Sequence, residues 1–374
     1  MLARTRSTLI STRQFSPRHK PLTIWRTRLP QLPTATSSVQ RRIFLDEAIP
    51  TVLVPPAVFT GLLLGLWAYK CFMTVVFQDR IIYMPYMPPF ARSEKIADYA
   101  AVCRPVSWRE ERMRSLDGTR ISLCVGQISH EGSKIKDSSQ KVVICYFQGN
   151  GGSTPARLPL LSQVLKLVHV QKQEIQCTLV ALSYRGYWKS SGRATQKGME
   201  LDAQAMLQWV ATQFPNAPLV LWGQSIGAGV ASTAAATLMK PSTKSNLAGL
   251  IMETPFTSVA SMLLALYPEK WLPYRYLTPF LWNHWDSEIA LRTLSAHSKT
   301  APCPILLMPA TRDEVVPAEE IGKFEGLCKD LKLQYERKDV IGALHTEATT
   351  RREGQYAVAE FVLRQLRRDR TVND

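Results

Sequence analysis

The stretch that decides the fold is "LVLWGQSIGAGV", residues 219–230. Strand-forming residues lead into Ser225, which lies between Gly223 and Gly227, and small residues follow. At a strand-to-helix junction this G-x-S-x-G pattern predicts a sharp, strained turn that lifts the serine hydroxyl clear of the sheet. Side chains at 223 and 227 would collide with neighbouring backbone, so both glycines are expected in the elbow. An ordinary glycine-rich turn is the alternative, and the context favours a nucleophile.

Short apolar runs alternate with helical patterns along the rest of the chain beyond residue 99. Strands are expected at residues 120–128, 141–147, 175–184, 218–223, 247–253, 303–310 and 333–340. Most of these runs are apolar throughout, as expected of parallel strands that are covered on both faces. Helical patterns such as residues 197–213 lie between them. The alternation predicts a doubly wound α/β fold, with a mostly parallel central sheet flanked by helices.

A catalytic serine requires a base, and the base requires an acid that orients it. In a fold of this kind the chain order is serine, acid, histidine, and reactive groups lie in loops after the strands. His345, in the loop after the last expected strand, is the favoured base. His284 and His297 precede the strand at 303–310 and are expected to be surface or lid residues.

The favoured acid is Asp313, in the loop "PATRDEVVP" after the strand that ends near Pro309. Its neighbour Glu314 is a weaker alternative, since consecutive side chains point in different directions. Glu253 is the stronger rival because it ends another expected strand; otherwise it is a structural hydrogen-bonding carboxylate. The sequence therefore favours Asp313 and keeps Glu253 as an alternative.

Two backbone N–H groups are expected to form the oxyanion hole. One belongs to Ile226, directly after the serine, and the other to Asn150 in the glycine-rich loop "FQGNGGS", residues 147–153. A flexible glycine turn is the alternative for this loop. A dinucleotide-binding loop is excluded, because the G-x-G-x-x-G spacing is not met and no acid follows at the required distance.

The N-terminal residues 1–45 carry nine basic residues and no acidic residue, a large part of the net charge of +16. This composition, which is also rich in Ser and Thr, predicts a mitochondrial presequence that is disordered or cleaved. A disordered basic tail is the alternative. The favoured location is the mitochondrial inner membrane, with the endoplasmic reticulum as the alternative.

A membrane anchor is expected at residues 48–77. Residues 48–69 hold 22 consecutive uncharged positions, and the apolar run resumes after Lys70. This length suffices to cross a bilayer as a helix, which is expected to begin near Pro56 and to run toward Phe77. Basic residues before the span favour a large C-terminal domain across the membrane. Lys70, Arg80 and Arg92 oppose that orientation.

No cofactor, metal or nucleic acid is expected. The seven cysteines form no C-x-x-C pair, and Cys124, Cys145 and Cys177 lie in apolar runs where buried, inert thiols are expected. No nucleic-acid motif is present, and the basic charge is concentrated at one end. The sequence gives no indication of oligomeric state.

The combined motifs resemble a known family. "YFQGNGGS", "LSYRGYWKSSG", "LWGQSIGAG", "METPFTS", "WDS", "RDEVVP" and a late "LH" occur in the order seen in membrane-anchored α/β-hydrolase-domain serine hydrolases, as does "FQDRIIYMP" after the anchor. The resemblance covers about residues 78–366 and implies an α/β-hydrolase domain at 78–374. It also implies a Ser225, Asp313 and His345 triad that cleaves carboxylic ester or thioester bonds of acyl or lipid-like substrates through an acyl-enzyme.

Two positions depart from the family pattern. Many relatives have histidine where this chain has Gln148, which changes the hydrogen bonding around the oxyanion loop. Trp188 replaces a small residue and is expected to narrow the space beside that loop. Neither departure removes a member of the predicted triad.

An insertion at about residues 256–302 is expected to act as a lid. It is rich in aromatic residues, namely Tyr267, Trp271, Tyr274, Tyr276, Phe280, Trp282 and Trp285. Such insertions can roof an acyl pocket. The alternative is that these aromatics are ordinary core and that Asp286 only caps a helix.

The competing function is a non-catalytic, membrane-tethered scaffold of the same fold. An intact triad argues against it. Chemistry with an Asp nucleophile, such as dehalogenation, is disfavoured because the elbow carries a serine.

Overall fold

The computed structural model describes residues 50–128, 140–239, 246–297 and 303–373. It divides into two compact units, Met1–Val58 and Phe59–Asp374. The predicted targeting segment at 1–45 lies outside the described residues, so the presequence stays a prediction.

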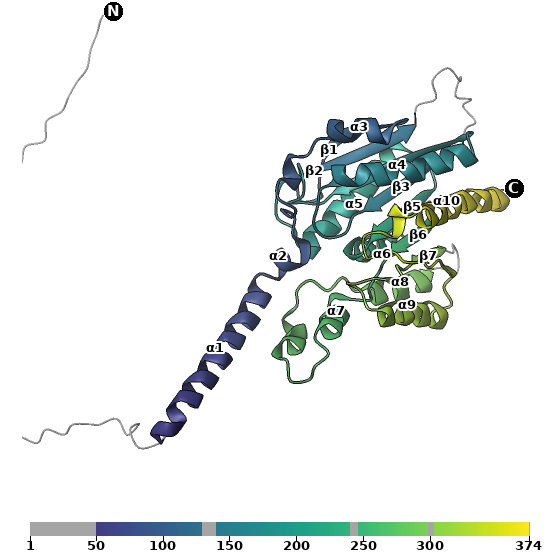
Figure 1. Cartoon of the computed structure of the whole chain (residues 1–374). Helices are drawn as coiled ribbons and strands as arrows, with labels where there is room; N and C mark the ends of the chain where they lie inside the picture. The colour runs from purple at the N-terminus through teal and green to yellow at the C-terminus, as the bar shows by residue number, and fades with distance from the viewer. Residues whose placement is uncertain (1–49, 129–139, 240–245, 298–302, 374) are drawn as a thin grey trace, which may run out of the picture. The chain divides into compact units, whose positions relative to one another are not determined.

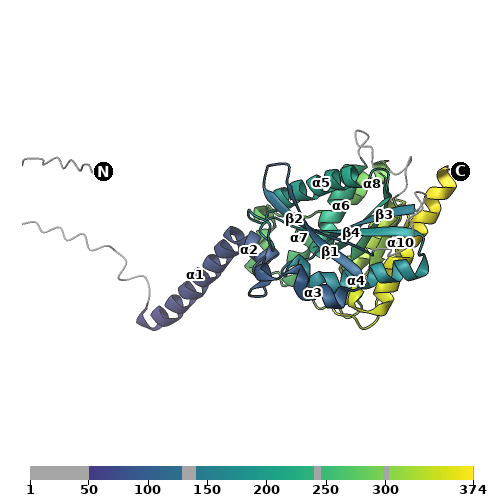
Figure 2. The same cartoon turned by 90° about the horizontal axis from the view of Figure 1, so that it is seen from above.

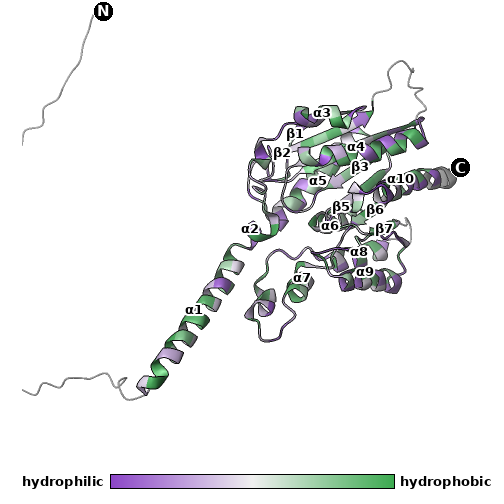
Figure 3. Cartoon of the chain, viewed as in Figure 1, coloured by the Kyte–Doolittle hydropathy of each residue, from purple (hydrophilic) through white to green (hydrophobic). Residues whose placement is uncertain are grey.

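The first described elements are a 3-10 turn, η1 (Thr51–Leu53), and the apolar helix α1 (Val54–Val76). Together they form a stretch of 26 residues with no buried residue, and an 18-residue window within it has a mean hydropathy of 1.8. The stretch is therefore long and apolar enough to cross a membrane. The green colour along α1 in Figure 3 shows this hydrophobic character. The helix begins two residues before the predicted Pro56 and ends one residue before Phe77.

Eight strands form one sheet (Figure 1), in the order β1-β2-β4-β3-β5-β6-β7-β8. Strand β2 pairs antiparallel with β1 and β4, and all other pairs are parallel. The strands are β1 (Val106–Arg114), β2 (Arg120–Ile128), β3 (Gln140–Phe147), β4 (Ile175–Ser183), β5 (Leu219–Gln224), β6 (Leu247–Glu253), β7 (Ile305–Met308) and β8 (Tyr335–Arg337). The expected mostly parallel sheet is confirmed.

Helices cover both faces of this sheet (Figure 2). The helices after α1 are α2 (Gln78–Tyr83), α3 (Ile96–Cys103), α4 (Thr154–Gln171), α5 (Gln196–Gln213), α6 (Ile226–Leu238), α7 (Val259–Leu266), α8 (Ser287–His297), α9 (Ala318–Asp330) and α10 (Arg352–Asn373). Short 3-10 turns are η2 (Ala91–Ser93), η3 (Pro273–Phe280) and η4 (Ala348–Thr350). Helices α5, α6, α8 and α9 share one buried apolar cluster with the sheet, and α3, α4 and α10 share the other.

The sheet places the predicted catalytic residues at one edge. Ser225 follows β5, Asp313 follows β7, and His345 follows β8, so all three lie beyond the carboxyl ends of parallel strands. These ends meet at the same side of the sheet, where α/β folds carry their functional groups.

The insertion between β6 and β7 has two different parts. Helix α8 packs into the core through Ala290, Leu291 and Leu294, and Trp285 before it is fully buried. Helix α7 has no buried residue, and η3 has one, Leu277. The reading of the aromatics as ordinary core therefore holds for Trp285, whereas Trp271, Tyr276, Phe280 and Trp282 are exposed.

All seven cysteines are free, and all except Cys71 are buried. Burial raises the pKa of the Cys145 and Cys177 thiols to about 12. These thiols carry the protonated, unreactive form at neutral pH.

Candidate active site

The turn from β5 to α6 brings the serine into a strained conformation. Ser225 has φ 53° and ψ −120°, a conformation that L residues rarely adopt. A Cβ at Gly223 would lie 2.1 Å from the carbonyl oxygen of Gly227, and a Cβ at Gly227 would lie 2.1 Å from that of Phe147. Only glycine fits these two positions, and the close approach of backbone on both sides keeps the Ser225 turn sharp.

His345 bridges the serine and an acid. Its Nε2 lies 2.9 Å from the Ser225 hydroxyl, and its Nδ1 lies 3.0 and 2.9 Å from the two oxygens of Asp313. The side chains of Asp313 and His345 are less than one tenth exposed. Asp313 is itself fixed, because its Oδ1 accepts the backbone N–H groups of Val315 and Val316. The arrangement can pass a proton from the hydroxyl to the imidazole while the carboxylate holds the ring.

The rival acid Glu253 does not contact His345. Its buried carboxylate accepts hydrogen bonds from the Trp222 indole, from the Gln224 amide, and from both the N–H and the hydroxyl of Thr349. Burial raises its pKa, while the bonds from Thr349 and Trp222 act in the opposite direction. Glu253 therefore cross-links β5, β6 and η4, which is the structural alternative that the sequence left open.

Glu314 bonds the backbone of His345, whereas the sequence suggested it as an alternative acid for the imidazole ring. Its carboxylate accepts the backbone N–H of His345 at 2.9 Å. It thus fixes the histidine loop from the backbone side, while Asp313 contacts the ring. Nothing in the sequence distinguished these two roles, because the two acids are adjacent in one loop.

The loop that follows β3 lies against the serine elbow. A Cβ at Gly149 would lie 3.4 Å from the Gln224 carbonyl oxygen and 3.5 Å from the Ser225 Cβ. Among the described residues, the backbone N–H groups of Asn150 and Ile226 donate to no protein acceptor. Both N–H groups are therefore free to act as donors, as an oxyanion hole requires.

Gln148 and Trp188, which depart from the family pattern, are both buried. The Gln148 side-chain oxygen accepts the Thr154 hydroxyl at 3.0 Å, and its backbone oxygen accepts the Tyr184 hydroxyl at 2.9 Å. Gln148 thus joins the oxyanion loop to α4 and to the residue that follows β4. The Trp188 indole donates to the Glu94 carbonyl oxygen at 2.7 Å, so its ring packs toward the segment before α3.

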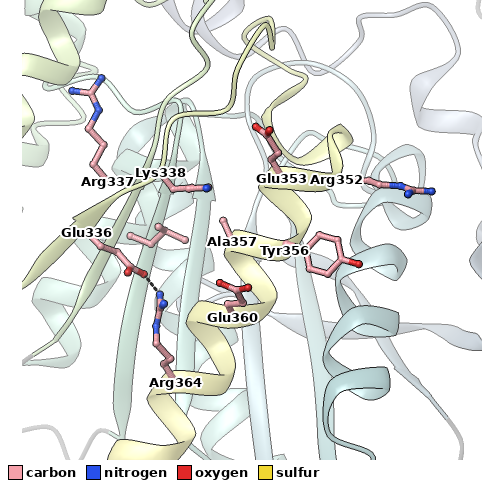
Figure 4. A pocket seen from close by; sticks show the side chains of 10 residues that line it. Glu336, Arg337, Lys338, Arg352, Glu353, Tyr356, Ala357, Glu360 and Arg364 are labelled. Atoms are coloured by element: carbon pink, nitrogen blue, oxygen red, sulfur yellow. Dashed lines mark hydrogen bonds and ion pairs between the residues drawn. The ribbon is translucent and has the colours of Figure 1, made fainter.

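A cavity of about 360 Å³ lies between β8 and α10 (Figure 4). Most of its lining consists of charged side chains, and two of them, Arg364 and Glu336, form an ion pair. Neither Ser225 nor Asp313 nor His345 lines it. Within the described ranges, no cluster of three or more His, Cys, Asp or Glu side chains has the arrangement of a metal site.

Comparison with known proteins gives the same fold. The family model described as alpha/beta hydrolase fold matches residues 142–284. Among solved structures, an alpha-beta hydrolase from Vibrio vulnificus superposes with a TM-score of 0.57 at 18% identity, covering 77% of this chain and 92% of that one. An esterase from Pyrobaculum calidifontis gives a TM-score of 0.51 at 15% identity, covering 75% and 91%. At these identities the likeness concerns the fold alone.

Three curated relatives extend the comparison. Protein bem46 of Schizosaccharomyces pombe is 27% identical over 51% of this chain and 58% of its own length. The alpha/beta hydrolase domain-containing protein WAV2 of Arabidopsis thaliana is 25% identical over 66% and 73%. The lysophosphatidylserine lipase ABHD12 of Danio rerio is 32% identical over 50% of this chain and 46% of its own length.

The match thus spans between about half and three quarters of the length of these relatives. The family model covers residues 142–284, which include the serine elbow. The predicted α/β-hydrolase fold is confirmed by the family model and by the superposition. The fold and the similar chains together support a hydrolase. The chain therefore has the α/β-hydrolase fold and is similar to α/β-hydrolase-domain proteins.

Proposed function

We propose that this protein is a membrane-anchored serine hydrolase that cleaves carboxylic ester or thioester bonds of acyl or lipid-like substrates. The observation that carries the proposal is the hydrogen-bonded series of Ser225, His345 and Asp313, with Nε2 2.9 Å from the hydroxyl and Nδ1 2.9 Å from the carboxylate. This is the geometry that activates a serine hydroxyl for acyl transfer.

Ser225, His345, Asp313 and the two N–H groups each take part in the proposed reaction. His345 removes the Ser225 proton while the oxygen attacks the substrate carbonyl, and Asp313 stabilises the charged imidazole. The N–H groups of Ile226 and Asn150 bind the negatively charged oxygen of the tetrahedral intermediate. His345 then protonates the leaving alcohol or thiol, which yields the acyl-enzyme. Water, activated by the same histidine, releases the acid and restores the serine.

An amphiphilic substrate is favoured by the apolar surface of the chain. Trp271, Tyr276, Phe280 and Trp282 in the insertion are about half to two thirds exposed, and no residue of α1 is buried. Exposed aromatic side chains of this kind occur where proteins meet a lipid–water boundary. Relatives that carry the name lysophosphatidylserine lipase support the same class, an acyl ester with a polar head group.

The test is covalent labelling of the purified full-length protein with a fluorophosphonate probe, which reacts with activated serines. We expect the wild type to be labelled and Ser225→Ala to be unlabelled. Ser232→Ala is the matched control, because this buried serine lies in the following helix and only bonds the Gly229 carbonyl. Absence of labelling in folded wild type, or equal labelling of Ser225→Ala, would favour the non-catalytic scaffold instead.

The mitochondrial inner membrane is the proposed location, with the endoplasmic reticulum as the alternative. The proposal rests on the basic composition of residues 1–45 and on the apolar helix that follows them. Fractionation of cells that express the full-length chain separates the two locations. Recovery with endoplasmic reticulum markers, and no loss of the first 45 residues, would overturn the mitochondrial assignment.

A further inference from the structure

The residues that directly follow α1, numbers 78–88, are integrated into the hydrolase domain; we call them the α2 segment. Gln78 and Asp79 are buried although they are polar. The Gln78 amide donates to the Phe280 carbonyl oxygen at 3.1 Å, and Asp79 accepts the Trp282 indole N–H at 2.9 Å. The start of the segment is thus held by the end of η3 and the residues after it.

Tyr83 fixes the other end of α2. Its ring is fully buried, and its hydroxyl donates to Asn283 Oδ1 at 2.7 Å while it accepts the Trp285 indole N–H at 2.9 Å. Asn283 in turn donates to Asp79 at 2.7 Å. A closed set of hydrogen bonds therefore holds the backbone of residue 83 in one place.

The α2 segment contacts the oxyanion loop through its backbone carbonyl groups. The Tyr83 carbonyl accepts the N–H of Gly151 at 2.9 Å, and the Met87 carbonyl accepts the N–H of Gly152 at 2.5 Å. The hydroxyl of the buried Tyr187 also donates to the Tyr83 carbonyl. Gly151 and Gly152 have φ values of 65° and 71°, which turn these two N–H groups toward the segment.

The opposite side of the loop faces the nucleophile. On one side of Asn150, Gly149 lies against the Ser225 Cβ. On the other side, Gly151 donates its N–H to the α2 segment. Gly151 and Gly152 direct their N–H groups to the α2 segment, which leaves the N–H groups of Gly149 and Asn150 without a protein acceptor among the described residues. Of these two, the Asn150 N–H is the donor assigned to the oxyanion hole in the proposed function.

We propose that the α2 segment is a structural part of the active site, and that Tyr187 and Tyr83 are positioning residues which set the oxyanion loop. This inference rests on the proposed function for its effect on rate. It assigns a second role to the polypeptide after α1: the segment that leaves the apolar helix is also the outer wall of the oxyanion hole.

The decisive variant is Tyr187→Phe, which removes the hydroxyl bond to the Tyr83 carbonyl and leaves that carbonyl paired with Gly151. Losing a whole oxyanion donor lowers kcat by about 10²–10³-fold, so a displaced donor is expected to lower it about tenfold. KM for a p-nitrophenyl acyl ester should stay within about twofold, because the donor binds the transition state more strongly than the ester. Ki for a trifluoromethyl ketone, whose bound form carries the oxyanion, should rise about tenfold in parallel.

Rates are expressed per active site titrated with the fluorophosphonate probe, so that misfolded protein does not contribute. The matched control is Tyr356→Phe, outside the segment in α10, whose half-exposed ring lines the cavity between β8 and α10 and whose loss of a hydroxyl should leave all constants at wild-type values. Tyr83→Phe, which loses the bonds to Asn283 and Trp285, is the second variant and decides by the same criteria if Tyr187→Phe does not fold.

Hydrogen exchange tests the positioning without any reaction. The amides of Gly151 and Gly152 should exchange faster in Tyr187→Phe than in wild type, and amides in α9 should be unchanged. Wild-type kcat, Ki and exchange rates in the variants would overturn the inference. Faster exchange in a protein that no probe labels would instead support the structural role and contradict the proposed function alone.

Discussion

The imidazole of His345 lies 2.9 Å from the hydroxyl of Ser225, although 120 positions of sequence separate the two residues. The contact depends on two features at the carboxyl ends of the parallel strands. Strand β5 delivers the serine through a strained turn, and the loop after β8 is held by Glu314 on its backbone and by Asp313 on its ring.

Replacing Asp313 with asparagine should abolish most turnover and leave the fold intact. The amide N–H₂ would face Nδ1, so the ring proton would move to Nε2, which could then no longer accept the Ser225 proton. We expect kcat to fall by about 10³–10⁴-fold. Steady-state kinetics on a chromogenic ester measure this. Glu253→Gln is the comparison: if it lowers kcat as far in folded protein, the acid assignment is wrong.

Substituting alanine for Gly227 should prevent stable folding. The added Cβ would lie 2.1 Å from the Phe147 carbonyl oxygen, and both groups belong to backbone that cannot move independently. We expect a loss of more than about 4 kcal/mol in the free energy of unfolding, seen in urea denaturation. Gly326→Ala provides the contrast, since no atom lies within 4 Å of its Cβ position in α9. It should stabilise the protein by about 0.5–1 kcal/mol.

The stability that Glu320 contributes to the protein should be lost in acid. Burial tends to raise the pKa of this carboxyl, but bonds from Lys323, Ser261 and Thr257 outweigh it and hold the pKa below the usual 4.5. The folded state therefore binds this proton less tightly than the unfolded chain. The contribution to stability is complete above about pH 4.5 and is lost as the pH falls through the lower, folded pKa.

The check is urea unfolding of wild type and Glu320→Gln between pH 7 and pH 3. The difference between the two proteins should be about 1–2 kcal/mol at pH 7 and should shrink toward acid. A difference that grows on acidification would contradict the sign of the pKa shift. Because Glu320 bonds both Thr257 and Ser261, the start of α7 should lose protection from hydrogen exchange in the variant.

Two lysines in the middle of α1 should release the protein from membranes. Each lysine at the centre of a spanning helix costs about 2.5–3.5 kcal/mol, so Leu62→Lys with Leu64→Lys should prevent stable insertion. Alkaline carbonate extraction should then recover the variant in the supernatant and the wild type in the pellet. Lysines at the exposed Val102 and Ile341 control for added charge. Wild type in the supernatant would exclude the anchor.

Most of the sheet was predictable because its strands are buried on both faces and therefore read as unbroken apolar runs. Strands β2 and β6 have the expected limits, and β7 and β8 are shorter than expected. Strand β1 was missed. Its sequence "VSWREERMR" alternates charged residues with half-buried ones, as an edge strand does, and contains no apolar run.

The arrangement of the candidate site was predictable where it depends on the ends of strands, and not where it depends on bonds to backbone carbonyl groups. Ser225, Asp313 and His345 each follow a strand, which chain order alone reveals. The choice between Asp313 and Glu253 needed the burial of Glu253 and its donors from Trp222 and Thr349. The contact between the α2 segment and the oxyanion loop joins backbone groups, which leave no signature in residue type.

The burial of the cysteines determines how the domain responds to oxidising and reducing compartments. A thiol that stays protonated and enclosed neither pairs with another nor reacts with glutathione, and the pKa values of Cys145 and Cys177 lie near 12. The covalent structure of the domain would therefore be the same in an oxidising and in a reducing compartment. Redox chemistry places no restriction on which face of a bilayer the hydrolase domain occupies.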